Sequence, residues 1–333
     1  MKKSLLRLLR CLDCRSELEL LPAKTEGEEI TEGSLKCRRC ARSYPIVGAI
    51  PRFVPAENYA HSFGVQWNEF RQTQLDSHTG LPLSRERFFF STGWAPEELD
   101  GALVLDVGCG AGRFAEVALD CGAEVVARDY SSAVDACWKN LGHRPKLHVL
   151  QGDIYGLPFE PGSFDRVYCL GVLQHTPDVA AAFAALPRQV RPGGRLGVDV
   201  YPKLLRNLLW SKYWVRPFTK GMAPDRLFRL VKWLVRYLLP VSLAISRVPV
   251  IGPKLRFALP VANHAPDWPL SPAQVREWAV LNTFDMLAPA HDHPQTQQTL
   301  RRWFENAGLR EVRVFRRGHI VGYGRKAGPE AER

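Results

Sequence analysis

Four of the eight cysteines lie close together near the start of the chain, in two Cys-x-x-Cys pairs: Cys11 with Cys14, and Cys37 with Cys40. Each pair directs two thiolates at one point, and two pairs complete a tetrahedral metal site. Because four protein ligands leave no open position, we expect a structural Zn²⁺ rather than a catalytic one. A module this small cannot build its own core, so the metal would supply much of its folding free energy. Two redox-active pairs are the alternative interpretation.

A glycine-rich stretch follows an apolar run in Leu103-Val-Leu-Asp-Val-Gly-Cys-Gly-Ala-Gly-Arg-Phe114. Gly108, Gly110 and Gly112 permit a tight turn and a close approach of a ligand to the backbone. Their G-x-G-x-G spacing differs from the G-x-G-x-x-G of dinucleotide-binding turns. Asp106, two positions before the first glycine, would repel a pyrophosphate but not a cationic amino-acid group.

Acidic and apolar residues end the next three β-rich runs. Asp129 ends the second run, where a carboxylate can accept hydrogen bonds from ribose hydroxyls. Asp153 ends the third run, where it can accept from an exocyclic adenine amine, and Ile154 offers apolar packing to the ring. Leu170 ends the fourth run and completes the predicted cofactor-binding set.

These motifs, in this order and at this spacing, resemble those of class I S-adenosylmethionine-dependent methyltransferases, in the broad ubiquinone-type (methyltransferase type 11) group. The resemblance covers residues 102–201. It implies S-adenosyl-L-methionine as cofactor, in contact with Asp106, Asp129, Asp153 and the glycines. It also implies a seven-stranded sheet whose last strand is antiparallel. Arg128 departs from the family pattern, which has an apolar residue there, and we expect its side chain to extend past the ribose edge.

The segment that follows the second cysteine pair is Cys40-Ala-Arg-Ser-Tyr-Pro-Ile-Val-Gly-Ala-Ile-Pro-Arg-Phe53. It resembles the small zinc-ribbon domains of the Trm112 type, in which a tyrosine-proline strand runs into a glycine turn. Domains of that family often accompany methyltransferases as separate activators. The resemblance therefore implies a zinc ribbon that is fused here to the enzyme it would serve.

The elements that position these residues alternate between short β-rich runs and helical stretches from residue 102 onward. Such alternation predicts an α/β fold with a Rossmann-like parallel sheet and helices on both faces. The predicted parts are a zinc ribbon at 1–55, an aromatic connector at 56–101, the cofactor-binding core at 102–201, a basic helical insert or lid at 202–270, the C-terminal completion of the sheet at 271–325 and a polar tail at 326–333.

Candidate catalytic residues must lie near the carboxyl ends of the strands. Methyl transfer needs an aligned acceptor and, where that acceptor holds a proton, a base. His175 follows the fourth predicted strand, and a structural role in the turn after it is the alternative. Asp285, His291 and His293 belong to the proline-bounded segment Thr283–Pro294, which we expect to form a loop over the site. A capped helix start is the alternative for that segment.

The basic charge of the chain is local. Residues 203–256 hold twelve Lys or Arg and a single acid, Asp225, which gives this segment the same +11 charge as the whole chain. Residues 225–239 predict an amphipathic helix of the kind that lies at interfaces. Its basic face carries Arg226, Arg229, Lys232 and Arg236.

Three interpretations of this insert remain open. It can be a lid that packs its apolar face on the enzyme, a contact with a membrane surface or lipid-linked acceptor, or a nucleic-acid contact. The insert carries bulky aliphatic residues where an RNA-binding surface would carry exposed stacking aromatics among polar residues. This pattern disfavours the nucleic-acid interpretation.

These features predict methyl transfer from S-adenosylmethionine to a small-molecule or lipid-like acceptor, with the insert covering the acceptor site. An RNA methyltransferase that binds through the zinc ribbon and the insert is one alternative, and a non-catalytic regulator with a methyltransferase fold is another. No run of about 18 apolar residues is free of charge, so we expect no membrane span. The start of the chain is too short and too charged for a signal peptide, which predicts a cytoplasmic protein, peripheral at a membrane where the insert binds one.

Overall fold

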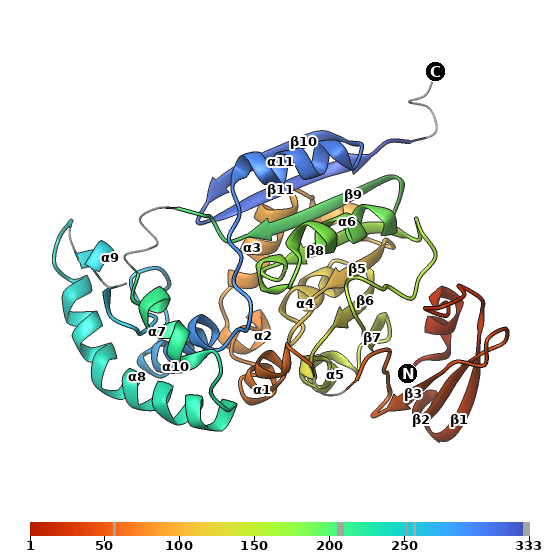
Figure 1. Cartoon of the computed structure of the whole chain (residues 1–333), viewed down its shortest axis with the longest axis horizontal. Coiled ribbons are helices and arrows are strands. Elements are labelled where there is room, and N and C mark those ends of the chain that lie inside the picture. The colour runs from red at the N-terminus through yellow and green to blue at the C-terminus, as the bar shows by residue number, and fades with distance from the viewer. Residues whose placement is uncertain (56–57, 205–209, 251, 256–257, 329–333) are drawn as a thin grey trace.

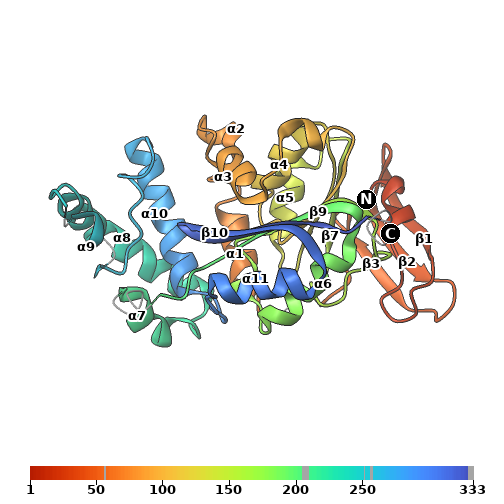
Figure 2. The same cartoon turned by 90° about the horizontal axis from the view of Figure 1, so that it is seen from above.

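The protein is built on one large sheet, with an N-terminal module at one end and a helical insert at the other (Figures 1 and 2). The computed structural model describes residues 1–55, 58–204, 210–250, 252–255 and 258–328. Most of the expected polar tail at 326–333 therefore lies outside the described residues, as do Arg206 and Arg256 of the basic insert.

Seven strands form the central sheet in the order β10-β11-β9-β8-β5-β6-β7. The five strands from β5 to β9 run parallel to their neighbours, whereas β11 pairs antiparallel with both β9 and β10. The strands are β5 Leu103–Val107, β6 Glu124–Asp129, β7 Leu147–Gln151, β8 Phe164–Leu170, β9 Val190–Val200, β10 Leu309–Arg317 and β11 His319–Lys326. This topology confirms the expected seven-stranded sheet with an antiparallel last strand.

Helices cover both faces of this sheet (Figure 2). On one face Phe88 and Phe114 share an apolar core with β5 and β6, and on the other Phe183 and Phe304 pack with β8 and β9. The helices of the first face are α3 Leu83–Thr92, α4 Arg113–Asp120 and α5 Ala133–Leu141, and those of the second are α6 Val179–Gln189 and α11 Gln297–Asn306. Because both faces are buried, the central strands are almost continuously apolar.

The N-terminal module is a four-stranded antiparallel sheet in the order β1-β2-β3-β4, preceded by a 3₁₀ turn, η1. Its elements are η1 Lys3–Leu8, β1 Leu18–Glu26, β2 Glu29–Cys37, β3 Ser43–Val47 and β4 Ile50–Pro51. One cysteine pair lies in the turn before β1. Of the other pair, Cys37 ends β2 and Cys40 lies in the turn between β2 and β3.

The module docks on the β7 edge of the large sheet through its backbone. Arg52 forms a parallel bridge with Gln151 at the end of β7, and the Phe53 N–H donates to the Gln151 carbonyl at 2.8 Å. The Arg15 guanidinium donates to the carbonyls of Leu157 and Phe159 at 2.9 Å each. An exposed sheet edge can template aggregation, and here the module covers it.

Residues 58–101, within the part expected as a connector, form four short helices that pack on the sheet and around the cavity. They are α1 His61–Glu69, α2 Asp76–Thr79, α3 and the 3₁₀ turn η2 Pro96–Leu99. The aromatic residues that suggested a connector pack inward: Phe88 is fully buried and contacts Trp94 and Tyr168. The segment is therefore part of the core and of the site.

The described part of the expected insert is helical, with α7 Ser211–Thr219, α8 Pro224–Ser246 and α9 Gly252–Leu255. The helix α10 Pro272–Leu287 follows it, in the part expected to complete the sheet. Two expectations were wrong in detail. The helix expected at 225–239 continues through Pro240 to Ser246, and that proline is exposed. A proline costs a helix one backbone hydrogen bond, which is tolerated best where water can reach the freed carbonyl. Asp285, expected on a loop, lies on the last turn of α10.

Across the described residues, every helix is either too short or too polar for a membrane crossing. The longest, α8, carries one buried apolar side and one side rich in exposed basic residues.

Candidate active site

A cavity opens at the carboxyl ends of β5, β6 and β8, where parallel sheets usually bind ligands. It holds about 1180 Å³ of space, solvent mouth included. The glycine turn after β5 forms its floor, α1 and α3 contribute Trp67 and Arg87, and α10 closes the opposite side with Asn282 and Asp285.

The glycine turn is shaped by left-handed backbone at all three glycines, with φ of 91° at Gly108, 52° at Gly110 and 95° at Gly112. A Cβ at Gly108 would clash with Val172, and one at Gly110 would lie 3.3 Å from the Trp67 indole. Gly112 differs from the other two. A Cβ there would lie 2.8 Å from Leu141 of α5, so this glycine serves helix packing and does not line the cavity.

Asp129 lines the cavity, and hydrogen bonds from Gly110 and Ser131 hold its carboxylate in place. Its carboxylate accepts hydrogen bonds from the Gly110 N–H at 3.0 Å and from the N–H and hydroxyl of Ser131 at 2.8 Å each. A carboxylate offers about four acceptor positions, so capacity remains for hydroxyls of a ligand. The orientation of the group is set before any ligand arrives.

Asp106 lies behind the glycine turn rather than in the cavity wall. It is 1 % exposed, and its Oδ2 has no hydrogen-bond partner among the described residues. Burial raises the pKa of this carboxyl to about 8, so it is mostly protonated at neutral pH. A cation bound over Gly108 and Cys109 would favour the ionised form.

The residues expected to contact adenine also divide between the cavity wall and the region outside it. Ile154 and Leu170 line the cavity. Asp153 does not, and its carboxylate accepts the Tyr155 N–H at 3.1 Å. Of the expected cofactor-binding residues, the structure therefore places Gly108, Gly110, Asp129, Ile154 and Leu170 in the cavity wall, and Asp106, Gly112 and Asp153 outside it.

Two of the four candidate catalytic residues meet at the cavity. His175, in the 3₁₀ turn η3 Leu173–His175, and Asp285 both line it, although they lie far apart in the sequence. The Asp285 carboxylate accepts from the Tyr201 hydroxyl at 3.4 Å, and the His175 ring contacts that tyrosine edge-on. Tyr201 also lines the cavity, and no sequence motif singled it out.

The protonation of His175 follows from its contacts. Its Nδ1 lies 3.0 Å from the carbonyl oxygen of His291, which can only accept, so Nδ1 carries the hydrogen. Desolvation by burial lowers the pKa of the ring. His175 is therefore neutral near pH 7, with Nε2 unprotonated and able to accept a proton.

The other two candidates, His291 and His293, do not line the cavity. The His291 ring packs against Tyr59 and His293, and burial lowers its pKa. Asp292 between them is buried in ion pairs with Lys212 at 3.2 Å and Arg216 at 3.4 Å. The 291–293 segment thus contacts His175 through the His291 backbone carbonyl. The ion pairs of Asp292 link the segment to α7.

Arginines of the cavity wall are the main group that the sequence did not reveal; Arg71, Arg87, Arg113 and Arg128 all line it. Arg87 pairs with buried Asp199 at 2.8 Å, and this partner and His319 hold the pKa of that aspartate well below its usual range despite its burial. Arg128, which we expected to extend past the ribose edge, lines the cavity as a buried side chain. It is 2 % exposed, and its Nε and Nη2 have no partner among the described residues.

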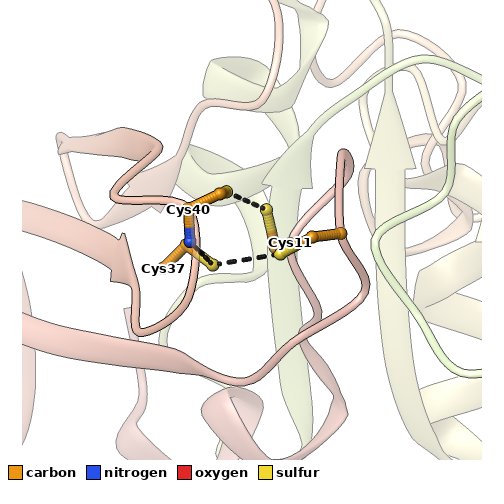
Figure 3. A group of neighbouring side chains, drawn as sticks. Cys11, Cys37 and Cys40 are labelled. Carbon is orange, nitrogen blue, oxygen red and sulfur yellow. Dashed lines mark hydrogen bonds between the residues drawn. The ribbon is translucent and has the colours of Figure 1, made fainter.

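The four cysteines of the module converge on one point, and Figure 3 labels three of them, Cys11, Cys37 and Cys40. Their sulfur atoms all lie within 4.8 Å of one another, with Cys11 3.5 Å from Cys40 and Cys14 3.4 Å from Cys37. Four sulfurs around a zinc ion at about 2.3 Å would be about 3.8 Å apart, so this donor set fits a closed four-coordinate metal. No other such group occurs in the described part of the chain.

The strand order, the glycine turn after β5, the acid that ends β6 and the cavity above them define the fold of class I S-adenosylmethionine-dependent methyltransferases. Comparison with known families agrees with this class. Residues 105–198 match the methyltransferase domain family, and residues 2–48 match the Trm112p-like protein family. The chain thus carries a methyltransferase domain behind an N-terminal Trm112p-like domain.

Individual relatives match over part of their length. An uncharacterized protein of Synechococcus sp. is 30% identical over 234 residues, which cover 67% of this chain and 50% of that protein. A ubiquinone biosynthesis O-methyltransferase of Xylella fastidiosa is 34% identical over 147 residues, which cover 41% of this chain and 60% of that enzyme. The chain spans about half the length of the curated relatives it matches.

Solved structures were also compared. A chain of a complex that contains the Haloferax volcanii Trm112 methyltransferase activator has a TM-score of 0.47 at 13% identity, and the match covers 82% of this chain and 99% of that one. The CurJ carbon methyltransferase has a TM-score of 0.45 at 12% identity, covering 82% of this chain and 62% of that one.

Proposed function

We propose that this protein transfers a methyl group from S-adenosylmethionine to a small-molecule or lipid-like acceptor. One observation carries the proposal: a single cavity joins the glycine turn and Asp129 on one side to His175, Tyr201 and Asp285 on the other. A cofactor on the first side would direct its reactive end toward the second. The relatives named as ubiquinone biosynthesis O-methyltransferases support an acceptor of low molecular weight.

The residues around the cavity fit the cofactor. When bound, S-adenosylmethionine supplies an electrophilic methyl group on a sulfonium. Asp129 would accept from the ribose hydroxyls, and Ile154 and Leu170 would enclose the adenine ring. Asp153, next to Ile154 but outside the cavity wall, would have to turn toward the cavity to accept from the adenine amine. Asp106, buried and with an open acceptor position, would neutralise the cationic amino-acid end.

The acceptor side combines an apolar wall with a proton acceptor. Phe63, Trp67 and Val172 line it with His175 and Asp285. An acceptor hydroxyl that hydrogen-bonds to Nε2 of His175 would lose its proton to that atom as the new bond forms. Asp285 would orient the acceptor directly or through Tyr201.

Calorimetric titration with S-adenosylmethionine tests the cofactor side. Asp129→Ala should weaken binding about 10- to 100-fold, because hydrogen bonds to a charged group are lost. Glu97→Ala, which removes an exposed carboxylate of η2, is the matched control and should bind as the parent protein does. Unchanged affinity in the Asp129 variant would remove the proposal.

The pH dependence of binding tests Asp106. The neutral carboxyl must ionise to pair with a cation, so binding should release a proton near pH 7 and affinity should rise from pH 7 to 9. Titrations in buffers of different ionisation enthalpy measure that proton. Asp106→Asn should abolish the release; release that persists in this variant would contradict the role.

Methyl transfer itself is measured as S-adenosylhomocysteine formation with a panel of phenols, prenylated phenols and lipid extracts. His175→Gln and Asp285→Asn should lower turnover about 100-fold or more and leave cofactor binding intact. Retained turnover in both would show that the acceptor side lies elsewhere. If no acceptor is methylated but the cofactor binds, a regulatory role of the fold takes precedence.

We propose Zn²⁺ as the metal of the four-cysteine site and a structural role for it. The sulfur donors and the closed geometry favour this ion. Elemental analysis of protein purified without chelators should find about one zinc per chain.

We propose the division of the chain into the parts that the sequence indicated, with the basic insert covering the acceptor side. The packing of α7 and α8 on α10, which carries Asp285, supports that role. For the exposed side of the insert, we propose peripheral membrane contact through 225–239. RNA binding is the alternative, because the insert is positively charged.

A further inference from the structure

The insert exposes most of the large apolar side chains found at the surface. Within the described residues, eleven large hydrophobic side chains are exposed, and eight of them lie between residues 214 and 255. The whole insert stands at the end of the molecule opposite to the N-terminal module (Figure 1). Soluble surfaces rarely concentrate apolar groups in this way without a partner.

One face of α8 arranges these groups in rows. We call it the docking face, and it comprises Arg229, Lys232, Trp233, Arg236, Tyr237 and Val241. Trp233, Tyr237 and Val241 follow one another at four-residue steps, so they form a ridge along the helix. Trp233 and Tyr237 are 56% and 54% exposed, with their rings 5.3 Å apart.

A basic row runs beside this ridge. Arg229, Lys232 and Arg236 are exposed, and in the described structure only Lys232 has a carboxylate partner, Glu69 at 3.5 Å between two exposed side chains. Such a surface pair contributes little and is easily exchanged. The row therefore offers at least two cations without counter-charges to a partner.

Aromatic side chains beside basic ones on a helix too polar to cross a bilayer are typical of segments that lie in the plane of a membrane. Trp and Tyr favour the headgroup region, because their rings are apolar at one end and polar at the other. Lys and Arg add attraction to anionic lipids. A protein partner would not require an excess of positive charge. RNA could stack on Trp233 and Tyr237, but it would leave the aliphatic Val241, 48% exposed in the same ridge, without an apolar partner.

We propose that the docking face of α8 binds the surface of an anionic phospholipid bilayer, with the helix axis in the membrane plane. The inference deepens the proposed function and rests on it for the acceptor, which would be a lipid-soluble molecule taken from that surface. Trp233 and Tyr237 enter the headgroup layer, and the basic row pairs with lipid phosphates.

The buried side of α8 connects the docking face to the cavity. Phe228 stacks on Phe284 of α10 with ring centroids 3.8 Å apart, and Asp285 follows in that helix and lines the cavity. The membrane-binding helix is thus packed directly on the helix that carries an acceptor-side carboxylate.

Flotation of the full chain with vesicles tests the proposal. The protein should float with phosphatidylcholine–phosphatidylglycerol vesicles, remain behind with phosphatidylcholine alone, and detach as salt rises. The variant R229Q/K232Q/R236Q should lose on the order of 100-fold in partitioning, at about fivefold per charge. W233A/Y237A should lose about tenfold or more. The matched control R302Q/R313Q/R316Q, which removes three exposed charges from α11 and β10, should float normally.

Several results would overturn the proposal. They are equal flotation with neutral vesicles, an equal loss in the control variant, no flotation at all, or displacement by a structured RNA that binds with a steeper salt dependence. Cofactor titration of the same samples separates the two proposals. Retained cofactor binding without flotation defeats only the membrane inference, whereas flotation without cofactor binding defeats the proposed function.

Discussion

The N-terminal module and the helical insert are attached to the same sheet in different ways. The module joins the β7 edge by backbone pairing at Arg52 and Phe53, and its apolar residues merge with the main core. The insert packs through side chains on α10 and has a separate apolar cluster, in which Phe228 is central. A segment that completes a sheet edge adds stability to the whole fold, whereas one with its own cluster can present a free face.

The electrostatics of the two regions differ as well. Cations of the module pair with carboxylates of the main domain, as in the pairs of Arg10 with Glu160 and of Arg52 with Asp135. The insert keeps a row of cations on α8 with little compensation. This difference predicts that changes in the module act mainly on folding, and changes on the insert surface mainly on binding.

The largest effect should follow loss of the metal site. Cys37→Ser removes a buried ligand, and apparent metal-binding free energies of about 10–16 kcal/mol set the upper limit of the loss. We expect loss of zinc by elemental analysis and a strongly lowered midpoint of thermal unfolding. Cys121→Ser, outside the cluster, is the control. If the module unfolds and the midpoint of the main thermal transition stays unchanged, the module is attached to the methyltransferase domain without contributing to its stability.

The next largest effect should come from the docking of the module. Phe53 is 7% exposed and packs on Tyr44 with ring centroids 4.6 Å apart. Phe53→Ala should lower the free energy of unfolding by about 3–5 kcal/mol, measured by urea denaturation. Val47→Ala, on an exposed site of β3, should change it little. Similar small losses for both would mean that the β7 interface contributes little.

Truncation inside the insert should cost less and act locally. Phe228→Ala leaves a cavity against Phe284, worth about 3 kcal/mol within the insert cluster. We expect faster amide exchange in α8 and α10 and lower methyl transfer, with unchanged affinity for S-adenosylmethionine. Phe218→Ala, at an 82% exposed site of α7, is the control. A parallel loss of cofactor affinity would show that the insert and the cofactor half of the cavity fold as one unit.

The smallest effect on stability should come from the docking face. Trp233→Ala removes an exposed ring and should change the free energy of unfolding by about 0.5 kcal/mol or less. The same variant should weaken vesicle binding. A marked loss of stability would mean that Trp233 packs on the protein in solution, and the contrast between module and insert would fail at this residue.

Local patterns carried the prediction of the sheet and of five of the eight expected cofactor-binding residues, which line the cavity. Alternating β-rich and helical runs from residue 102, the spacing of the three glycines and the acids that end strands are all properties of short segments. A buried parallel strand and a tight glycine turn depend on residues that are neighbours in the chain. The spacing within the two Cys-x-x-Cys pairs is also a local property, and it predicted that the four sulfurs converge on one point.

The acceptor half required the tertiary structure. His175, Tyr201 and Asp285 come from η3, the end of β9 and α10, and nothing in the chain between them encodes their meeting. Burial of Arg128 likewise depends on what packs around the end of β6. The sequence by itself determined the class of fold, the metal-ligand set and the basic, amphipathic character of the insert, because these follow from local spacing. Only the packing of distant segments decided which side chains line the cavity and which side of α8 faces outward, because burial is a property of the whole folded chain.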